Sequence, residues 1–94
     1  MENSKIVMEE LFNKLKEVFS NGELFTLHIK NAFMTMHKTC RRIDNMEIED
    51  DQVYITGPDY DFMFDLDGYS IEYEKEYNTY CVTNSGSEIS FCFL

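Results

Sequence analysis

The sequence predicts a single α+β domain over residues 1–94, with an N-terminal amphipathic helix packed on a curved antiparallel β-meander of about six strands. Three observations lead to this fold class. Apolar residues recur at helical spacing near the start, apolar and polar residues alternate through most of the second half, and turn-forming dipeptides separate the alternating runs. A chain of 94 residues is long enough to build one core and too short for a second.

The predicted helix spans residues 4–20. Its apolar side chains follow steps of three and four residues, at Val7, Leu11, Leu15, Val18 and Phe19. Ser4 is suited to cap the start of this helix, and Gly22 is suited to end it in the left-handed conformation. We expect the apolar side of the helix to cover the sheet.

The segment after the helix predicts one strand, followed by a stretch that could be either a helix or a strand. Residues 25–30 alternate apolar and polar side chains, as a half-buried strand does. Residues 31–43 fit either a possible second short helix capped by Asn31 or an irregular strand from Thr35 to Ile43. The sequence alone leaves both alternatives open.

Successive turns predict how the remaining strands pair. The Asp67-Gly68 dipeptide is a strong signal for a two-residue hairpin turn. The pairs that this turn predicts are Leu66 with Tyr69, Phe64 with Ile71 and Phe62 with Tyr73. Turns at 50–51, 57–60, 75–78 and 84–87 predict the pairs Ile48 with Val53, Met46 with Ile55, Ile55 with Phe62, Val53 with Phe64, Tyr73 with Tyr80, Ile71 with Val82, Val82 with Ile89 and Tyr80 with Phe91. All five turns keep one apolar face, an agreement that a slip of one residue would destroy.

Negative charge is concentrated in the second part of the chain. Residues 1–43 hold five carboxylates against seven Lys/Arg, whereas residues 44–94 hold thirteen carboxylates against Lys75, which together give the net charge of −10. The polar face of the predicted meander carries eight of these carboxylates: Glu47, Glu49, Asp61, Asp65, Asp67, Glu72, Glu74 and Glu76. Asp61 would lie directly opposite Glu74, and like charges at such positions repel.

This acidic face predicts a partner-binding surface. Two neighbouring strands with carboxylates at alternate positions carry on the order of one charge per 3.4 Å, close to the density of one DNA strand. We therefore expect the eight carboxylates to bind a basic protein surface, that of a nuclease, a CRISPR-type effector or another nucleic-acid-binding protein. The chain would then be a small acidic inhibitor that acts as a nucleic-acid mimic.

Two other functions fit the same composition. The chain could be an immunity or regulatory protein that neutralises a toxin or enzyme by acidic contacts without nucleic-acid mimicry. It could also be a small subunit whose interface is the helix or the last strand, with an acidity that serves solubility alone. The small size and the charge layout have the character of phage-encoded antagonists of host nucleases, anti-CRISPR proteins among them, although no motif of a known family is present.

The motifs of catalysis and metal binding are weak, and we expect no catalytic residue, no cofactor and no metal site. His37 and Cys40 stand at helical i, i+3 spacing with His28 nearby, but two or three such ligands make a weak zinc signal. Residues 44–51 contain several acids and lack the glycine of a calcium-binding loop. No nucleophile signature surrounds any of the three cysteines, so we expect a protein that is not an enzyme.

Charge and composition also restrict the partners and the location. A chain this acidic predicts no direct binding of nucleic acid and none of anionic membranes. The odd number of cysteines and the absence of an apolar signal segment favour the cytoplasm. Tyr54 and Tyr77 are expected on or near the acidic side, where they would enlarge a protein interface. Residues 91–94 are expected to form the last core strand; the alternative is an edge strand that pairs with a second copy, so a homodimer is an alternative assembly.

Overall fold

The α+β class is confirmed: one helix precedes a set of strands that pair only in antiparallel fashion. The computed structural model describes residues 2–94, with side chains from Lys5 onward. In chain order the elements are α1 (Glu2–Asn21), β1 (Phe25–Asn31), β2 (Thr35–Cys40), β3 (Asn45–Glu49), β4 (Gln52–Gly57), β5 (Tyr60–Asp65), β6 (Ser70–Glu74), the 3-10 turn η1 (Lys75–Tyr77), β7 (Thr79–Thr83) and β8 (Ser87–Phe93).

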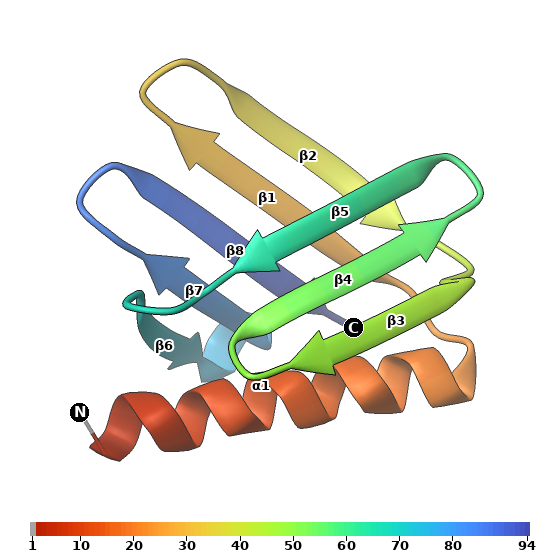
Figure 1. Ribbon diagram of the computed structural model, residues 1–94, viewed down its shortest axis with the longest axis horizontal. Helices are drawn as coiled ribbons and strands as arrows, with labels where there is room; N and C mark the ends of the chain where they lie inside the picture. Colours follow the sequence, from red (N-terminus) through yellow and green to blue (C-terminus); the bar gives the residue numbers. More distant parts are fainter. Residues whose placement is uncertain (1) are drawn as a thin grey trace.

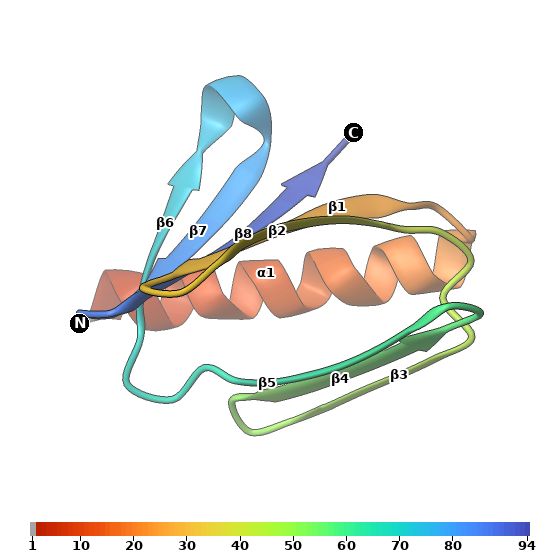
Figure 2. The same ribbon diagram turned by 90° about the horizontal axis from the view of Figure 1, so that it is seen from above.

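The strands form two sheets rather than the single predicted meander. Sheet A has the strand order β2-β1-β8-β7-β6, and sheet B has the order β3-β4-β5 (Figure 1). Figure 2 shows the two sheets facing one another, with α1 lying along one open side between them. The apolar faces meet in the space between the sheets, where the ring of Phe64 from sheet B lies 5.8 Å from that of Phe91 in sheet A.

Helix α1 closes the core and ends as the sequence predicts. Leu11, Leu15 and Val18 are almost fully buried against the two sheets. Gly22 takes a positive φ of 68°, and the N–H of Glu23 donates to the carbonyl of Val18 at 3.0 Å, the pattern of a Schellman C-cap. The start differs from the prediction, because the helix already begins at Glu2 and contains the proposed cap Ser4. Within residues 2–94, no helix combines the length and the apolar character needed to cross a bilayer.

Of the two alternatives for residues 31–43, a short helix or a strand, the structure has the strand, β2. The side-chain oxygen of Asn31 accepts hydrogen bonds from the N–H groups of Phe33 (2.8 Å) and Met34 (3.0 Å), so it caps a hairpin turn rather than a helix. β2 then pairs with β1 from Lys30 opposite Thr35 to Phe25 opposite Cys40. Because β2 has no further partner, it forms one edge of sheet A.

Four of the five predicted turns join strands in the predicted register. All eight pairs expected from the turns at 50–51, 57–60, 75–78 and 84–87 are confirmed residue by residue. The agreement follows from the strict period of a strand, since each turn places the apolar residues of both strands on the same face.

The fifth prediction, at Asp67-Gly68, is wrong. A turn does form there, with the N–H of Tyr69 donating to the carbonyl of Leu66 at 3.2 Å, but β5 and β6 then separate into different sheets. Leu66 does not pair with Tyr69 in a ladder, Phe64 pairs with Val53 rather than Ile71, and Phe62 pairs with Ile55 rather than Tyr73. One continuous sheet would leave its apolar face to a single helix, whereas two sheets cover each other.

The last strand is in the interior of sheet A. β8 pairs with β1 on one side and with β7 on the other. The prediction that residues 91–94 form the last core strand is confirmed for Phe91 and Phe93, which are buried. The alternative of a free edge for a second copy is wrong, because a strand paired on both sides has no free backbone groups to offer. The edges of the two sheets are β2 and β6 in sheet A, and β3 and β5 in sheet B.

Candidate functional site

The structure divides the eight predicted carboxylates between two surfaces. Glu47, Glu49, Asp61 and Asp65 belong to sheet B, and Asp67 follows in the turn after β5. Glu72 and Glu74 lie on β6 of sheet A, and Glu76 lies on η1. The prediction of one continuous acidic face is wrong, because it depended on the pairing of β5 with β6. Asp61 pairs with Thr56 and Glu74 pairs with Thr79, so the predicted opposition of Asp61 and Glu74 does not occur.

The outer face of sheet B is a small plane of carboxylates around an apolar centre. Its three cross-strand rows are Glu49 with Gln52 and Asp65, Glu47 with Tyr54 and Met63, and Asn45 with Thr56 and Asp61. The alternate residues face inward, and among them Val53 and Ile55 are fully buried. Tyr54 is half-buried and Met63 is 70% exposed, so the middle row presents an apolar patch between acids.

Acid groups are densest at the end of sheet B where β3 turns into β4. The N–H of Leu66 donates to the carbonyl of Asp51 at 2.9 Å, which holds the end of β5 against this turn. A shallow hollow there is lined by Glu49, Asp50, Asp51, Gln52, Asp65 and Asp67. The sequence analysis considered Asp50 and Asp51 as a turn and within a weak calcium-loop pattern, but not as part of the acidic face. Their place beside Glu47 and Glu49 in the chain was the signal that could have added them.

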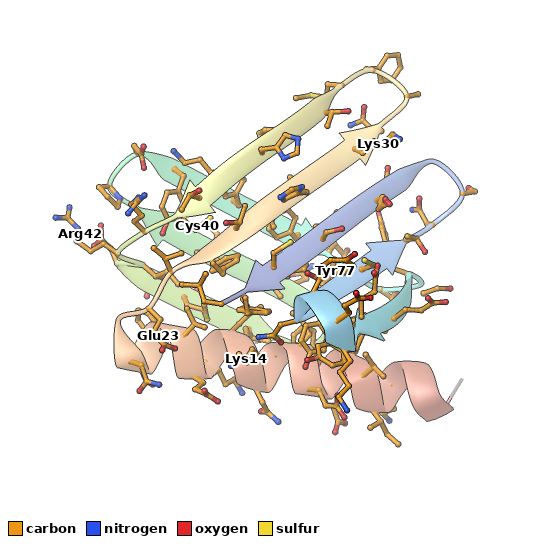
Figure 3. The ribbon with its side chains drawn as sticks, turned by 180° about the vertical axis from the view of Figure 1, so that it is seen from behind. Lys14, Glu23, Lys30, Cys40, Arg42 and Tyr77 are labelled. Carbon is orange, nitrogen blue, oxygen red and sulfur yellow. The ribbon has the colours of Figure 1, made fainter. Side chains whose placement is uncertain are left out.

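We name this region the acidic surface. It consists of Glu47, Glu49, Asp50, Asp51, Asp61, Asp65 and Asp67, with Tyr54 and Met63 at its centre. Tyr54 therefore lies on the acidic side as predicted. Tyr77 does not, because it is part of η1 beside sheet A, where it is 65% exposed (Figure 3).

None of the ion pairs formed by the side chains from residue 5 onward involves the acidic surface, although Lys5 of the helix lines a neighbouring hollow together with Asp50 and Asp51. Lys14 pairs with Glu17 on the helix at 3.5 Å. Lys38 pairs with Asp59 at 2.7 Å, and Arg42 with Asp44 at 3.7 Å, both at the opposite end of sheet B. The hydrogen bond from Lys38 lowers the pKa of the Asp59 carboxyl. Sheet B is therefore polarised, with neutralised acids at one end and unpaired acids at the other.

The carboxylates of sheet A form a separate and smaller group. Glu74 accepts a hydrogen bond from the thiol of Cys81 at 3.2 Å, and Ser90 donates to the same sulfur at 3.7 Å. Glu72 faces Cys81 across the ladder. Burial raises the pKa of the Cys81 thiol, and the nearby Glu74 acts in the same direction, so this sulfur is held in its protonated form.

Of the three residues considered for zinc, His28 and His37 come together, but Cys40 does not join them. Because β2 is a strand, His37 and Cys40 point to opposite faces of sheet A. Cys40 is fully buried in the core, and burial raises its pKa to about 11, which disfavours the thiolate that metal binding requires. His37 faces His28 instead, with ring centroids 4.2 Å apart. In the part of the chain with described side chains, no three His, Cys, Asp or Glu residues are grouped to hold a metal ion.

Comparisons of the chain with protein-family models, with curated proteins and with solved structures found no match.

Proposed function

We propose that this protein is a non-enzymatic inhibitor that binds a basic surface of a nucleic-acid-binding protein through the acidic surface and so blocks that protein's ligand. The observation that carries the proposal is the gathering of seven carboxylates on one face and turn of sheet B, none of which forms an ion pair with a Lys or Arg among the side chains from residue 5 onward. Basic surfaces of the required size are typical of proteins that bind nucleic acids.

The physical basis is a fixed negative field. Carboxylates held on strands and a tight turn lose little freedom when a partner docks, so less of the interaction energy is spent on ordering them. Their field attracts a cationic partner over about a Debye length, ~8 Å at physiological salt, which speeds association and makes it dependent on ionic strength. The rigidity of the sheet thus supports binding.

The middle row of the acidic surface, with its apolar residues, decides which kind of partner the surface fits. Glu47 and Glu49 are about 6.8 Å apart along β3, but Asp61 and Asp65 are separated by about 13.6 Å along β5. The charge is therefore sparser than on the predicted eight-carboxylate face. Tyr54 and Met63 add an apolar patch of the kind that anchors protein interfaces. This patch favours a second candidate, an immunity or regulatory protein that neutralises its target by acidic contacts without imitating nucleic acid.

Two matched triple variants test whether the acidic surface binds. The first is Glu47→Gln, Glu49→Gln and Asp65→Asn on sheet B, and the second is Glu72→Gln, Glu74→Gln and Glu76→Gln on sheet A. Both remove three negative charges, so they change the net charge equally. We expect the wild-type chain and the sheet A variant to retain the same basic protein from a low-salt lysate, and the sheet B variant to lose it. Equal retention by both variants would contradict the proposal.

A competition experiment separates the two modes of inhibition. The retained protein is mixed with duplex DNA or with RNA, and the wild-type chain is added in increasing amounts. A mimic displaces the nucleic acid in proportion to its own binding. A protein that neutralises the target elsewhere forms a ternary complex instead, and that result would assign the immunity function.

A further inference from the structure

Sheet A carries a pair of histidines that the proposed function does not use. His28 on β1 and His37 on β2 are directly opposite in the ladder. Their ring centroids are 4.2 Å apart, and the ring planes meet at 75°. Leu27 and Cys40 point into the core, so the alternation of the two strands places His28 and His37 on the outer face of sheet A. Figure 3 views sheet A from this side, with sheet B behind it.

The two histidines differ in how the sheet supports them, because β1 is paired on both sides and β2 on one side only. His28 also faces Ser90 of β8, so its backbone is fixed within the sheet, and it is half-buried. His37 is exposed on the edge strand β2, where it is open to ions from solvent. The next row of the same face contains Lys30 and Thr35, and the exposed Lys30 ammonium can turn away into water.

We propose that His28 and His37 together bind one divalent transition-metal ion, Cu²⁺, Ni²⁺ or Zn²⁺, as a two-imidazole chelate across the β1–β2 pair, with water as the remaining ligands. Imidazole nitrogen is a preferred ligand of these three ions, and Cu²⁺ binds most tightly in the usual order of affinities. Because the two rings belong to neighbouring strands already paired by backbone hydrogen bonds, the ion has to order only side-chain torsions.

The observed separation is close to what a shared ion requires. With metal–nitrogen bonds of about 2.0–2.1 Å, two imidazoles bound to one ion at adjacent positions have ring centroids roughly 4.5–5 Å apart. The rings at 4.2 Å reach that arrangement by a small opening of the pair. The side chain of His37 can supply this movement, since it lies on the exposed edge strand.

The proposed site does not use the helical spacing of His37 and Cys40 that gave the weak zinc signal in the sequence. The i, i+3 spacing grouped His37 with Cys40, but the strand sends Cys40 into the core. His28 and His37 are nine residues apart, and only the β1–β2 hairpin makes them neighbours. A bound ion would link the edge strand to its neighbour, and we expect it to slow the opening of this edge.

Isothermal titration of an untagged chain with CuCl2, NiCl2 and ZnCl2 tests the proposal. Cys81 and Cys92 lie on the same outer face and could bind these ions themselves, so the titration uses a Cys81→Ser, Cys92→Ser background. We expect one ion per chain and a rise in the thermal midpoint that EDTA reverses. His28→Gln and His37→Gln should each weaken binding ~tenfold or more, a loss of about 1.4 kcal/mol or more.

Thr35→Gln is the matched control, because it places the same amide on the same strand and face as His37→Gln and leaves both imidazoles in position. It should bind as the parent chain does. Imidazole resonances followed by NMR should show that His28 and His37 respond together to the first equivalent of Zn²⁺. Unchanged affinity in either histidine variant, or no binding of any of the three ions by the parent chain, would overturn the proposal.

Discussion

At the scale of single residues, Gly57 is the position where sheet B leaves no room for a side chain. It pairs with Tyr60, and a Cβ at position 57 would overlap the Tyr60 ring. The ring cannot move freely, because it is 8% exposed and its hydroxyl donates to the carbonyl of Arg41 at 3.0 Å. The sequence showed Gly57 as part of a turn, but the close approach of Tyr60 depends on packing.

We therefore expect Gly57→Ala to destabilise the protein by about 1–3 kcal/mol. The measurement is the free energy of unfolding from urea titration. Gly86→Ala is the matched control, since a Cβ at position 86 meets open space, and it should change stability by less than about 0.5 kcal/mol. If both variants unfold at the same urea concentration, the packing of Tyr60 on Gly57 does not contribute.

Two buried groups that lose a proton at alkaline pH, the Cys40 thiol and the Tyr60 hydroxyl, predict how the stability of the protein depends on pH in that range. Burial raises the pKa of Cys40 from 9.0 to about 11 and that of Tyr60 from 10.0 to about 12. Between these values the unfolded chain releases its protons while the folded chain keeps them. Stability is therefore complete below about pH 9 and falls as the pH rises through 9–11, because deprotonation favours the unfolded state.

Urea titrations at intervals from about pH 8 to 11 check this expectation. Cys40→Ala should lower stability at every pH and flatten the slope above pH 9, and Tyr60→Phe should flatten it above pH 10. An unchanged slope in both variants would mean that other groups govern alkaline unfolding.

At the scale of elements, the hairpins show which properties of a strand are decided by residues close to it in the sequence. The turn at 50–51 and the alternation beside it decide that Ile48 faces Val53, and no distant residue is needed. Asp67-Gly68 carries an equally strong turn signal, yet its flanking strands part. Whether two strands continue in one sheet depends on what covers their apolar faces, and that is a long-range property of Phe64, Phe91 and the helix.

We expect the helix to stabilise the fold through the side chains that it places between the two sheets. Leu15→Ala should cost about 2–5 kcal/mol, because Leu15 is fully buried where α1 closes the core. Ile6→Ala on the same helix should cost less than about 1 kcal/mol, since Ile6 is 55% exposed. Thermal and urea unfolding measure both. Similar losses from the two variants would contradict a contribution of α1 that is set by burial, since alanine itself favours the helix and propensity would not lower stability in either variant.

At the scale of the whole molecule, charge is distributed unevenly. The net charge is −10, and most acids of the acidic surface, all except Asp61 and Glu47, lie at the end of sheet B away from Lys38 and Arg42. Repulsion within this surface opposes folding, because folding brings the acids closer together than they are in the extended chain. The clustering of these acids therefore costs the folded protein some stability.

Salt should therefore stabilise the protein. Raising NaCl from about 0.01 M to 1 M shortens the screening length from about 30 Å to about 3 Å, and we expect the thermal midpoint to rise. In the triple variant Glu47→Gln, Glu49→Gln and Asp65→Asn the rise should be smaller and the low-salt midpoint higher. A wild-type midpoint that falls with added NaCl would show that attractive ion pairs outweigh the repulsion.

The sequence by itself determined the helix, the strands of the second half and the register of four hairpins, because periodicity and turn chemistry act over fewer than about ten residues. Tertiary structure alone decided that the strands form two sheets, since only contact between distant apolar faces makes that division favourable. It thereby decided which carboxylates share a surface, sending Asp61 and Glu74 to different sheets and bringing His28 beside His37. The local sequence decides to which face of its strand a side chain points, but only the tertiary structure decides which strands are neighbours and therefore which side chains form one surface.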